Sequence, residues 1–182
     1  MVWFTSDWHL GHKRVLEYDN RPFDTIEEHD QRIIDNFNDL VEDEDIVYFL
    51  GDFCLHNKTH AESYMKQLNG NLFFIRGNHD KKDIVKLYQK YGTYLGEQAT
   101  IEVQKQKIIL NHCKMYVWFH SHHGSWNIHG HSHGGLDHII WGKSLDVSIN
   151  VTNYKPLSFL EVKQIMDNEK HVINYPDGHK DR

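Results

Sequence analysis

Potential metal ligands gather in five short segments of the sequence, each directly after an apolar run. These segments are Asp7-Trp-His9, Gly51-Asp52, Gly77-Asn-His-Asp80, Asn111-His112 and Gly130-His-Ser-His133. Their carboxylate, imidazole and amide groups suit divalent ions such as manganese, iron, zinc or nickel. The two cysteines do not have the spacing of a structural zinc site. The donors outnumber the ligands of one zinc ion and fit two ions that share a carboxylate, as in two-metal hydrolases.

Histidine is over-represented, with 16 residues in a chain of 182, and seven of them lie between His112 and His133. The longest uninterrupted run is the pair His122–His123, so the excess is not a purification tag. Because the histidines are dispersed over the ends of several apolar runs, the pattern favours a built metal site over a histidine-rich metal carrier.

These ligands can meet if the apolar runs are strands whose carboxyl ends share one edge of a sheet. Strands are predicted at 1–6, 45–50, 71–75, 93–103, 106–110, 126–128 and 145–149. Helices are predicted at 26–41, 59–68, 80–91 and 157–166. Strand and helix alternate up to residue 91, whereas the later strands follow one another without long helices and are expected to pair in a more antiparallel manner. We therefore expect an α/β (α+β) fold, a two-sheet β-sandwich flanked by helices.

Length and composition exclude several classes of protein. A chain of 182 residues and 21.7 kDa suits one domain over 1–182, with a polar tail at about 170–182 that carries one short strand at 171–174. A net charge of −6 disfavours extended nucleic-acid binding, which depends on neutralising many phosphates. No apolar run is long enough to cross a bilayer, and we expect no membrane partner. With two cysteines, no signal peptide and a ligand at Asp7, a cytoplasmic location is expected.

The five segments, in this order, resemble the motifs of the calcineurin-like metallophosphoesterase family over residues 7–133. Their flanking residues are similar to those of compact bacterial and phage-type members, as in Asp7-Trp-His-Leu-Gly-His12, Arg21-Pro-Phe23 and His123-Gly-Ser-Trp126. The resemblance implies an αββα fold and a hydrolase of phosphate esters. It assigns one metal ion to Asp7, His9, Asp52 and His133, and the other to Asp52, Asn78, His112 and His131. It also implies that His79 acts on the leaving group without binding metal.

Substrate recognition is less strongly marked in the sequence. His12, Arg21 and His123 are candidate substrate contacts, since imidazole and guanidinium groups suit phosphate oxygens. Many family members have glycine where this chain has Asn111, and no cap or accessory domain is present in this sequence to define a substrate. An open site favours a small phosphodiester or nucleotide as the substrate, and manganese is the expected metal, with iron, zinc, nickel and magnesium as alternatives. A nuclease or nucleic-acid end-processing enzyme, a phosphomonoesterase and a metal-dependent scaffold protein remain the other candidate functions.

Overall fold

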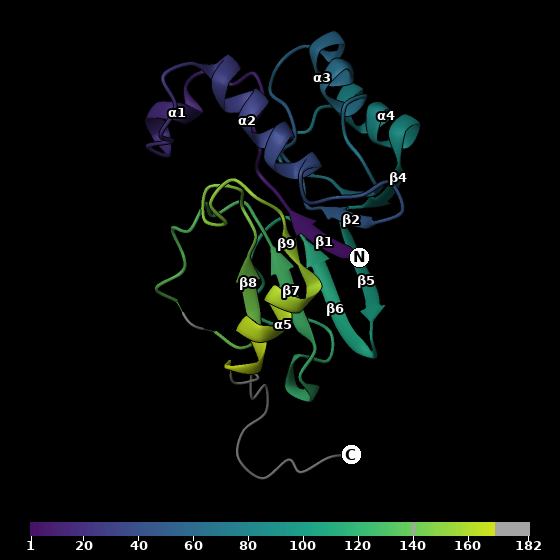
Figure 1. Ribbon diagram of the computed structural model, residues 1–182. Helices are drawn as coiled ribbons and strands as arrows, with labels where there is room; N and C mark the ends of the chain where they lie inside the picture. Colours follow the sequence, from purple (N-terminus) through teal and green to yellow (C-terminus); the bar gives the residue numbers. More distant parts are fainter. Residues whose placement is uncertain (140, 170–182) are drawn as a thin grey trace.

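The computed structural model describes residues 1–139 and 141–169, which form two sheets with helices packed around them (Figure 1). The first sheet has the order β4-β3-β2-β1-β9. Its strands are β1 (Val2–Thr5), β2 (Ile46–Phe49), β3 (Asn71–Ile75), β4 (Thr93–Gly96) and β9 (Leu157–Ser158). The first four run parallel, and β9 pairs antiparallel with β1. The carboxyl ends of β1, β2 and β3 therefore lie at one edge, where the first three ligand segments begin.

Three helices cover the outer face of this sheet, and capping residues mark where two of them begin. They are α2 (Ile26–Asn38), α3 (Lys58–Met65) and α4 (Lys82–Tyr91), and a single turn, α1 (Val15–Tyr18), precedes them. Thr25 Oγ1 accepts the Glu28 N–H at 3.1 Å, and Asn57 Oδ1 accepts the His60 N–H at 3.1 Å. The apolar faces of the helices pack on alternate residues of the strands, such as Trp3. The three long helices confirm the sequence prediction, while α1 has no counterpart in it.

The second sheet has the order β5-β6-β7-β8 and is mostly parallel. Its strands are β5 (Gln98–Val103), β6 (Gln106–Asn111), β7 (Trp126–His129) and β8 (Ser144–Asp146). Only β5 and β6 form an antiparallel pair, whereas β6, β7 and β8 run parallel. The expectation of more antiparallel pairing in the second half is therefore confirmed for β5 with β6 and for β9 with β1, and it was wrong for β6, β7 and β8. The run at 93–103 also divides into two strands that belong to different sheets.

The inner faces of the two sheets enclose a second core, which α5 (Phe159–Asp167) completes. Trp126 of β7 stacks on Phe159 at 5.7 Å between ring centroids. The predicted helix at 157–166 begins later than expected because Leu157 and Ser158 pair with β1, and Ser158 then forms a capping box with Glu161. Two mixed sheets flanked by helices in a single domain confirm the predicted fold class.

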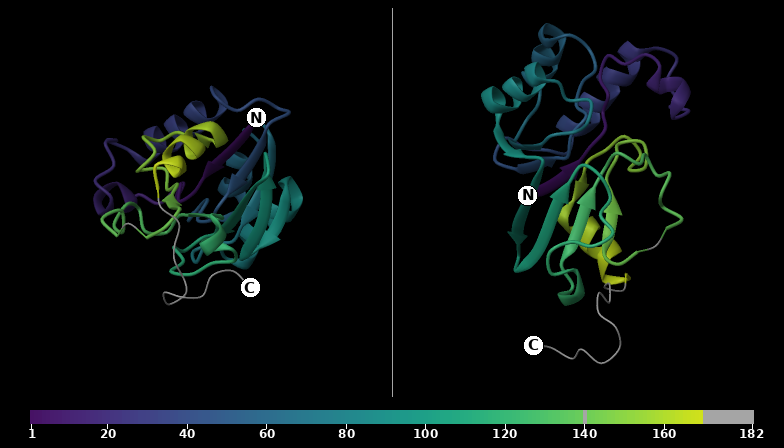
Figure 2. Two further views of the ribbon diagram at one scale, coloured as in Figure 1. Left: turned by 90° about the horizontal axis from the view of Figure 1, so that it is seen from below. Right: turned by 180° about the vertical axis from the view of Figure 1, so that it is seen from behind.

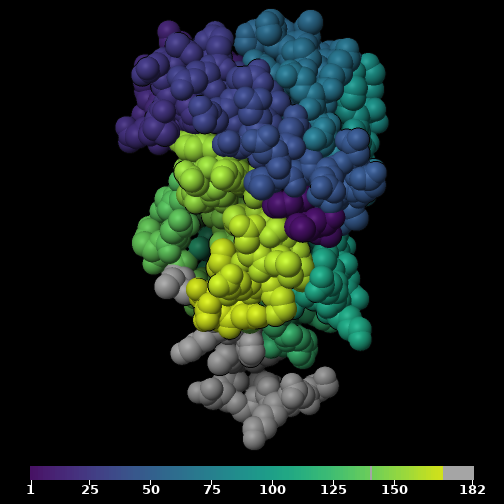
Figure 3. All heavy atoms as spheres, viewed as in Figure 1, coloured from purple at the N-terminus to yellow at the C-terminus, as the bar shows by residue number. Residues whose placement is uncertain are grey.

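The two sheets meet at the edge that carries the ligand segments. Ser6 pairs with Ser148, and Leu10 pairs with Cys54, in isolated parallel bridges beyond the strand ends. Figure 2 shows the same junction from two further sides, and Figure 3 shows the yellow-green segment after β8 packed directly beneath α2. The Asn36 side chain donates to the Tyr154 carbonyl at 2.9 Å across that contact. This junction, at the carboxyl ends of β1, β2, β3, β6 and β7, is referred to below as the rim.

Some of the chain lies outside these observations. The predicted tail at 170–182, with its strand at 171–174, falls outside the described residues. Within residues 1–139 and 141–169, no helix has the length and apolar character needed to cross a membrane.

Candidate metal centre

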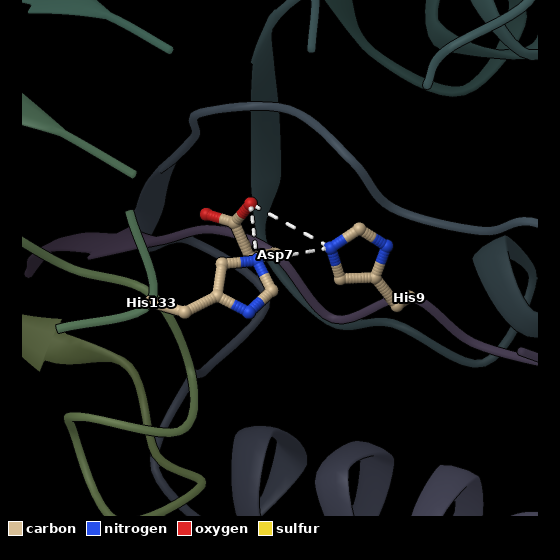
Figure 4. Close-up of side chains that lie close together, drawn as sticks. All are labelled: Asp7, His9 and His133. Atoms are coloured by element: carbon tan, nitrogen blue, oxygen red, sulfur yellow. Dashed lines mark hydrogen bonds and ion pairs between the residues drawn. The ribbon is translucent and has the colours of Figure 1, made fainter. Parts of the chain in front are cut away.

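Three of the predicted ligands converge at the rim from distant parts of the chain (Figure 4). His133 Nε2 lies 3.2 Å from Asp7 Oδ1, and His9 Nε2 lies 3.7 Å from the same oxygen. The two imidazole nitrogens are 3.2 Å apart. The donor atoms of this group all lie within 4.8 Å of one another, a spacing that a single cation can span.

A second group of donors adjoins the first and shares Asp7 with it. It consists of Asp7, Asp52 and His112, again with donor atoms within 4.8 Å. Asp52 Oδ2 lies 3.4 Å from His112 Nε2 and 3.8 Å from His9 Nε2, so this carboxylate also stands between the two groups. Two buried carboxylates surrounded by imidazoles form a donor set that suits divalent cations.

The last two predicted ligands lie on the side of His112. Asn78 Oδ1 is 2.8 Å from His112 Nε2. The His131 ring lies 5.1 Å from the His112 ring, and the His131 backbone N–H donates to Asp7 Oδ2 at 2.9 Å. The structure thus brings all seven predicted ligands to the rim.

The backbone at the ligands is held in a conformation that side chains rarely adopt. The φ angle is positive at five of the seven, namely Asp7 (58°), His9 (52°), Asp52 (56°), His131 (68°) and His133 (48°). Such residues cost on the order of 1–3 kcal/mol each and persist where surrounding contacts fix them. Two glycines allow the loops to approach, since a Cβ on Gly77 would meet Asp52 and one on Gly130 would meet Ser6 and Asp7.

Trp8, between two of the ligands, anchors the first loop in the core beneath the rim. Its side chain is fully buried and packs edge-on against Phe37 and Phe49, with ring centroids 5.2 and 5.0 Å away. Its indole N–H donates to Thr5 Oγ1 at 2.7 Å. Packing on Trp8 therefore fixes the directions in which Asp7 and His9 leave the strand.

Two further carboxylates hold the loops from below. Asp80 Oδ2 accepts the backbone N–H groups of Asp52 at 2.9 Å and of Gly77 at 2.7 Å. Asp146 Oδ2 accepts the Gly134 N–H at 3.0 Å and the Ser132 hydroxyl at 3.1 Å, which ties down the loop of His131 and His133. Sequence reasoning missed Asp146, although its place at the end of β8 repeats the pattern of the other ligand segments.

The charges at the rim shift the pKa values of its titratable groups. Burial opposes ionisation of Asp7, but its bonds to His133 and His9 outweigh burial and hold the Asp7 pKa well below its usual value. Burial also disfavours protonation of His112, yet Asp52 and Asp7 raise its pKa to about 9. Burial acts in the same direction on His133, whose bonds to Asp19 and Asp7 raise its pKa to about 10. The carboxylates at the rim therefore favour positive charge between them.

His79 lies at the rim without joining either group of donors. Its side chain is exposed, and its ring lies 5.7 Å from the His9 ring. Its backbone N–H donates to Asp52 Oδ1 at 2.8 Å. The imidazole is therefore free to meet a bound molecule, while the backbone orients the carboxylate between the donor groups.

The three predicted substrate contacts lie in different parts of the structure, and only one of them is at the rim. His12 lies at the rim, with its ring 6.1 Å from the His9 ring. The prediction for Arg21 was wrong, because its side chain is fully buried and all five of its N–H donors are bound to protein atoms. The prediction for His123 was also wrong, since it precedes the amino end of β7 and thus lies at the opposite end of that strand from the rim.

A cavity of about 360 Å³ opens beside the second donor group. Asn78 and His112 line it together with Arg76, Glu97 and Cys113. Asn111, where the sequence departs from the family pattern, accepts the Cys113 N–H at 2.8 Å and so shapes the turn after β6. The cavity provides space for part of a substrate directly next to the ligands.

Comparison with known proteins agrees with this geometry. The model of a family described as calcineurin-like phosphoesterase matches residues 1–161. An uncharacterised protein of Methanocaldococcus jannaschii is 37% identical over 184 residues, which cover 97% of each chain. The gene 66 protein of Mycobacterium phage L5 is 31% identical over 74% of this chain and 78% of its own. A crystal structure of a protein of unknown function from Aquifex aeolicus shares the fold, with a TM-score of 0.72 and 22% identity, over 91% of this chain and 98% of that one.

Proposed function

The chain belongs to the calcineurin-like phosphoesterase family, and we propose that this phosphoesterase uses two metal ions to hydrolyse a small phosphodiester or a nucleotide. The observation that carries the proposal is the convergence of seven donors from five segments, with two buried carboxylates between the imidazoles. The donor set is too large for one ion and suits two neighbouring ions.

We divide the donors between the two ions as the family resemblance implies. One ion is held by Asp7, His9, Asp52 and His133, and the other by Asp52, Asn78, His112 and His131. Asp52 is the proposed shared ligand because its Oδ2 faces an imidazole of each group. Asp7 also contributes to both groups in this structure. Manganese remains the expected metal. Nitrogen and oxygen donors suit it, but they do not by themselves select one first-row ion.

Metal ions in such a site activate a water molecule and neutralise the charge that develops on the phosphoryl oxygens. The protein's own residues then orient the reactants and move the remaining proton. We assign the general-acid role to His79, whose exposed imidazole can protonate the departing oxygen. Its backbone bond to Asp52 keeps the two groups in a fixed relation. His12 is the remaining candidate contact for a phosphate oxygen, since it lies beside His9.

Exposed cations next to His12 and Asp80 in the sequence support an anionic substrate, although the chain as a whole is acidic. Lys13 and Arg14 directly follow His12, while Lys81 and Lys82 directly follow Asp80. All four are exposed, and none forms an ion pair with another described residue. Cations gathered on one edge attract anions and raise their local concentration. A nucleic-acid end is therefore the second candidate substrate, and its binding would weaken with rising salt.

A substrate panel tests the proposal most directly. We expect the manganese-loaded protein to hydrolyse bis(4-nitrophenyl) phosphate with a higher kcat/KM than 4-nitrophenyl phosphate. The Asp52→Asn variant, measured in parallel, reports hydrolysis by contaminating enzymes. A higher kcat/KM for the monoester would instead identify a phosphomonoesterase. No turnover of any ester by metal-loaded protein would favour a scaffold function.

A further inference from the structure

A buried ion pair lies behind the first group of donors and touches two of its members. Arg21 and Asp19 form this pair, with Arg21 Nη2 and Asp19 Oδ2 2.9 Å apart. Neither residue belongs to the proposed ligand set, and neither lines the cavity beside the second donor group. Burying a charged pair is costly unless every donor and acceptor finds a partner, so its contacts indicate what it stabilises.

The guanidinium of Arg21 forms hydrogen bonds with the backbone of the first ligand loop. Its Nη2 donates to the Asp7 carbonyl and its Nη1 to the Trp8 carbonyl, both at 2.9 Å. Asp7 is one of the residues with positive φ, so its conformation depends on contacts of this kind. The two bonds fix the peptide on either side of the point where the Asp7 side chain leaves the backbone.

The carboxylate of Asp19 contacts His133, the last ligand in the sequence. Its Oδ2 lies 2.6 Å from His133 Nδ1. A histidine that donates its Nδ1 proton to a carboxylate presents the lone pair of Nε2 to a cation, with its ring orientation fixed. In this structure His133 Nε2 faces Asp7 Oδ1 at 3.2 Å.

The far side of the pair is anchored in the helical layer. Arg21 Nη1 contacts His29 Nε2 at 2.8 Å, and His29 Nδ1 contacts Asp30 Oδ1 at 2.8 Å. Asp30 Oδ2 in turn accepts the Gly11 N–H at 2.8 Å and the Tyr64 hydroxyl at 2.7 Å. A chain of bonds therefore connects His133 to α2 and α3.

We propose that Asp19 and Arg21 are positioning residues that set the affinity of one metal site, the site of Asp7, His9 and His133, and leave the other largely unaffected. The inference rests on the proposed two-metal function. The pair contacts His133, which belongs to the first group alone, and the backbone carbonyl of Asp7 rather than its carboxylate. Among the described residues, His112, Asn78 and His131 form no hydrogen bond or ion pair with it. Outer partners of metal ligands typically change metal affinity by about 10–100-fold when they are removed.

The test is a calorimetric titration of metal-free protein with Mn²⁺, followed by electron paramagnetic resonance of the loaded protein. For wild type we expect two equivalents and the spectrum of a coupled pair of ions. For Asp19→Asn we expect one equivalent to weaken about 10–100-fold and the coupling to disappear at limiting metal, while the other equivalent binds as before. Arg21→Lys should behave alike, since the three N–H donors of an ammonium cannot replace the five bonds of the guanidinium. Asp24→Asn is the matched control, because Asp24 is exposed and its side chain makes no hydrogen bond within the described residues.

Each outcome separates the inference from the proposed function. Wild-type protein that binds fewer than two equivalents would contradict the two-metal function itself. Two equivalents in wild type, with both retained at full affinity in Asp19→Asn or Arg21→Lys, would overturn the positioning role alone. Equal weakening of both equivalents would likewise overturn it, since the pair would then have a general structural role. Circular dichroism of the metal-free variants establishes whether they are folded. If Asp19→Asn does not fold, the metal titration of Arg21→Lys tests the positioning role.

Discussion

The two ends of the second sheet are both rich in histidine, but their surroundings differ. At the carboxyl ends of β6 and β7, His112, His131 and His133 face Asp7, Asp52 and Asp19. At the amino end, in the turn below β7 in Figure 1, His120 lies 3.4 Å from the ammonium of Lys107, and its ring lies tilted against the Phe119 ring, with centroids 4.0 Å apart. The same residue type therefore meets carboxylates at one end and a cation at the other.

This difference shows that the position of a histidine on the strand, rather than its abundance, identifies the candidate site. Carboxylates raise the pKa of His112 and His133, despite the opposing effect of burial. Partial burial and the charge of Lys107 instead lower the pKa of His120. A cation is attracted by the first environment and repelled by the second.

The largest expected effect follows from removing a carboxylate at the carboxyl end. Asp52→Asn should lower kcat/KM by about 10³-fold or more, because metal stabilisation of the transition state is worth several kcal/mol. It should also weaken both metal equivalents, since Asp52 faces an imidazole of each group. Metal analysis and steady-state kinetics measure the two effects. Retention of both ions at wild-type affinity would contradict the shared position of Asp52.

A smaller effect is expected from His79, which shares the rim without belonging to the donor groups. His79→Ala should lower kcat on the order of 10²-fold through loss of general-acid catalysis, while two metal ions remain bound. An ester with a better leaving group should suffer less, because its departing oxygen needs no proton. Loss of metal to the same extent as in Asp52→Asn would show that His79 is a ligand.

The raised pKa values at the carboxyl end predict a pH dependence of metal binding. His112 and His133 are protonated at neutral pH in metal-free protein, since their pKa values are about 9 and about 10. Both must lose a proton to bind metal, so binding should release protons and strengthen as the pH rises from about 6 towards 9. Calorimetry in buffers of different ionisation enthalpy counts the released protons. Binding without proton release at pH 7 would contradict ligation by these two imidazoles.

Strands β1, β2 and β3 of the first sheet were predictable because each is followed by a helix before the next strand begins. Thr25 and Glu28, for example, mark the start of α2 at the sequence level. The parallel pairing of β6 with β7 was not predictable, because a loop rather than a helix connects them and the usual signal of a crossover is missing. The short strands alone carry no information about the direction of their neighbours.

The candidate ligands were predictable for a related reason, namely that each follows the end of an apolar run. Asp19 was missed because a carboxylate that acts through another residue has no spacing of its own to mark it. Asp146 was missed although it stands at the end of β8, where the other segments carry their ligands. Arg21 was misread as a phosphate contact because its residue type fits that role and its burial is a property of the fold. His123 was misread because its residue type suits phosphate, although its position before β7 in the chain already places it at the amino end of that strand.

The smallest expected effect is at the amino end of the second sheet and tests the comparison from its other side. A triple variant, His120→Asn, His122→Asn and His123→Asn, should bind two metal ions and keep kcat/KM within about twofold of wild type. β7 has four residues, which place this turn roughly 13 Å from the rim at about 3.3 Å per residue. Asparagine suits the positive φ of 61° at His120, so strain should not obscure the result. His131→Asn is the matched change at the carboxyl end and should lose metal, although it removes one histidine instead of three. If the triple variant lost metal while His131→Asn retained it, the histidines of the amino end would be the functional ones.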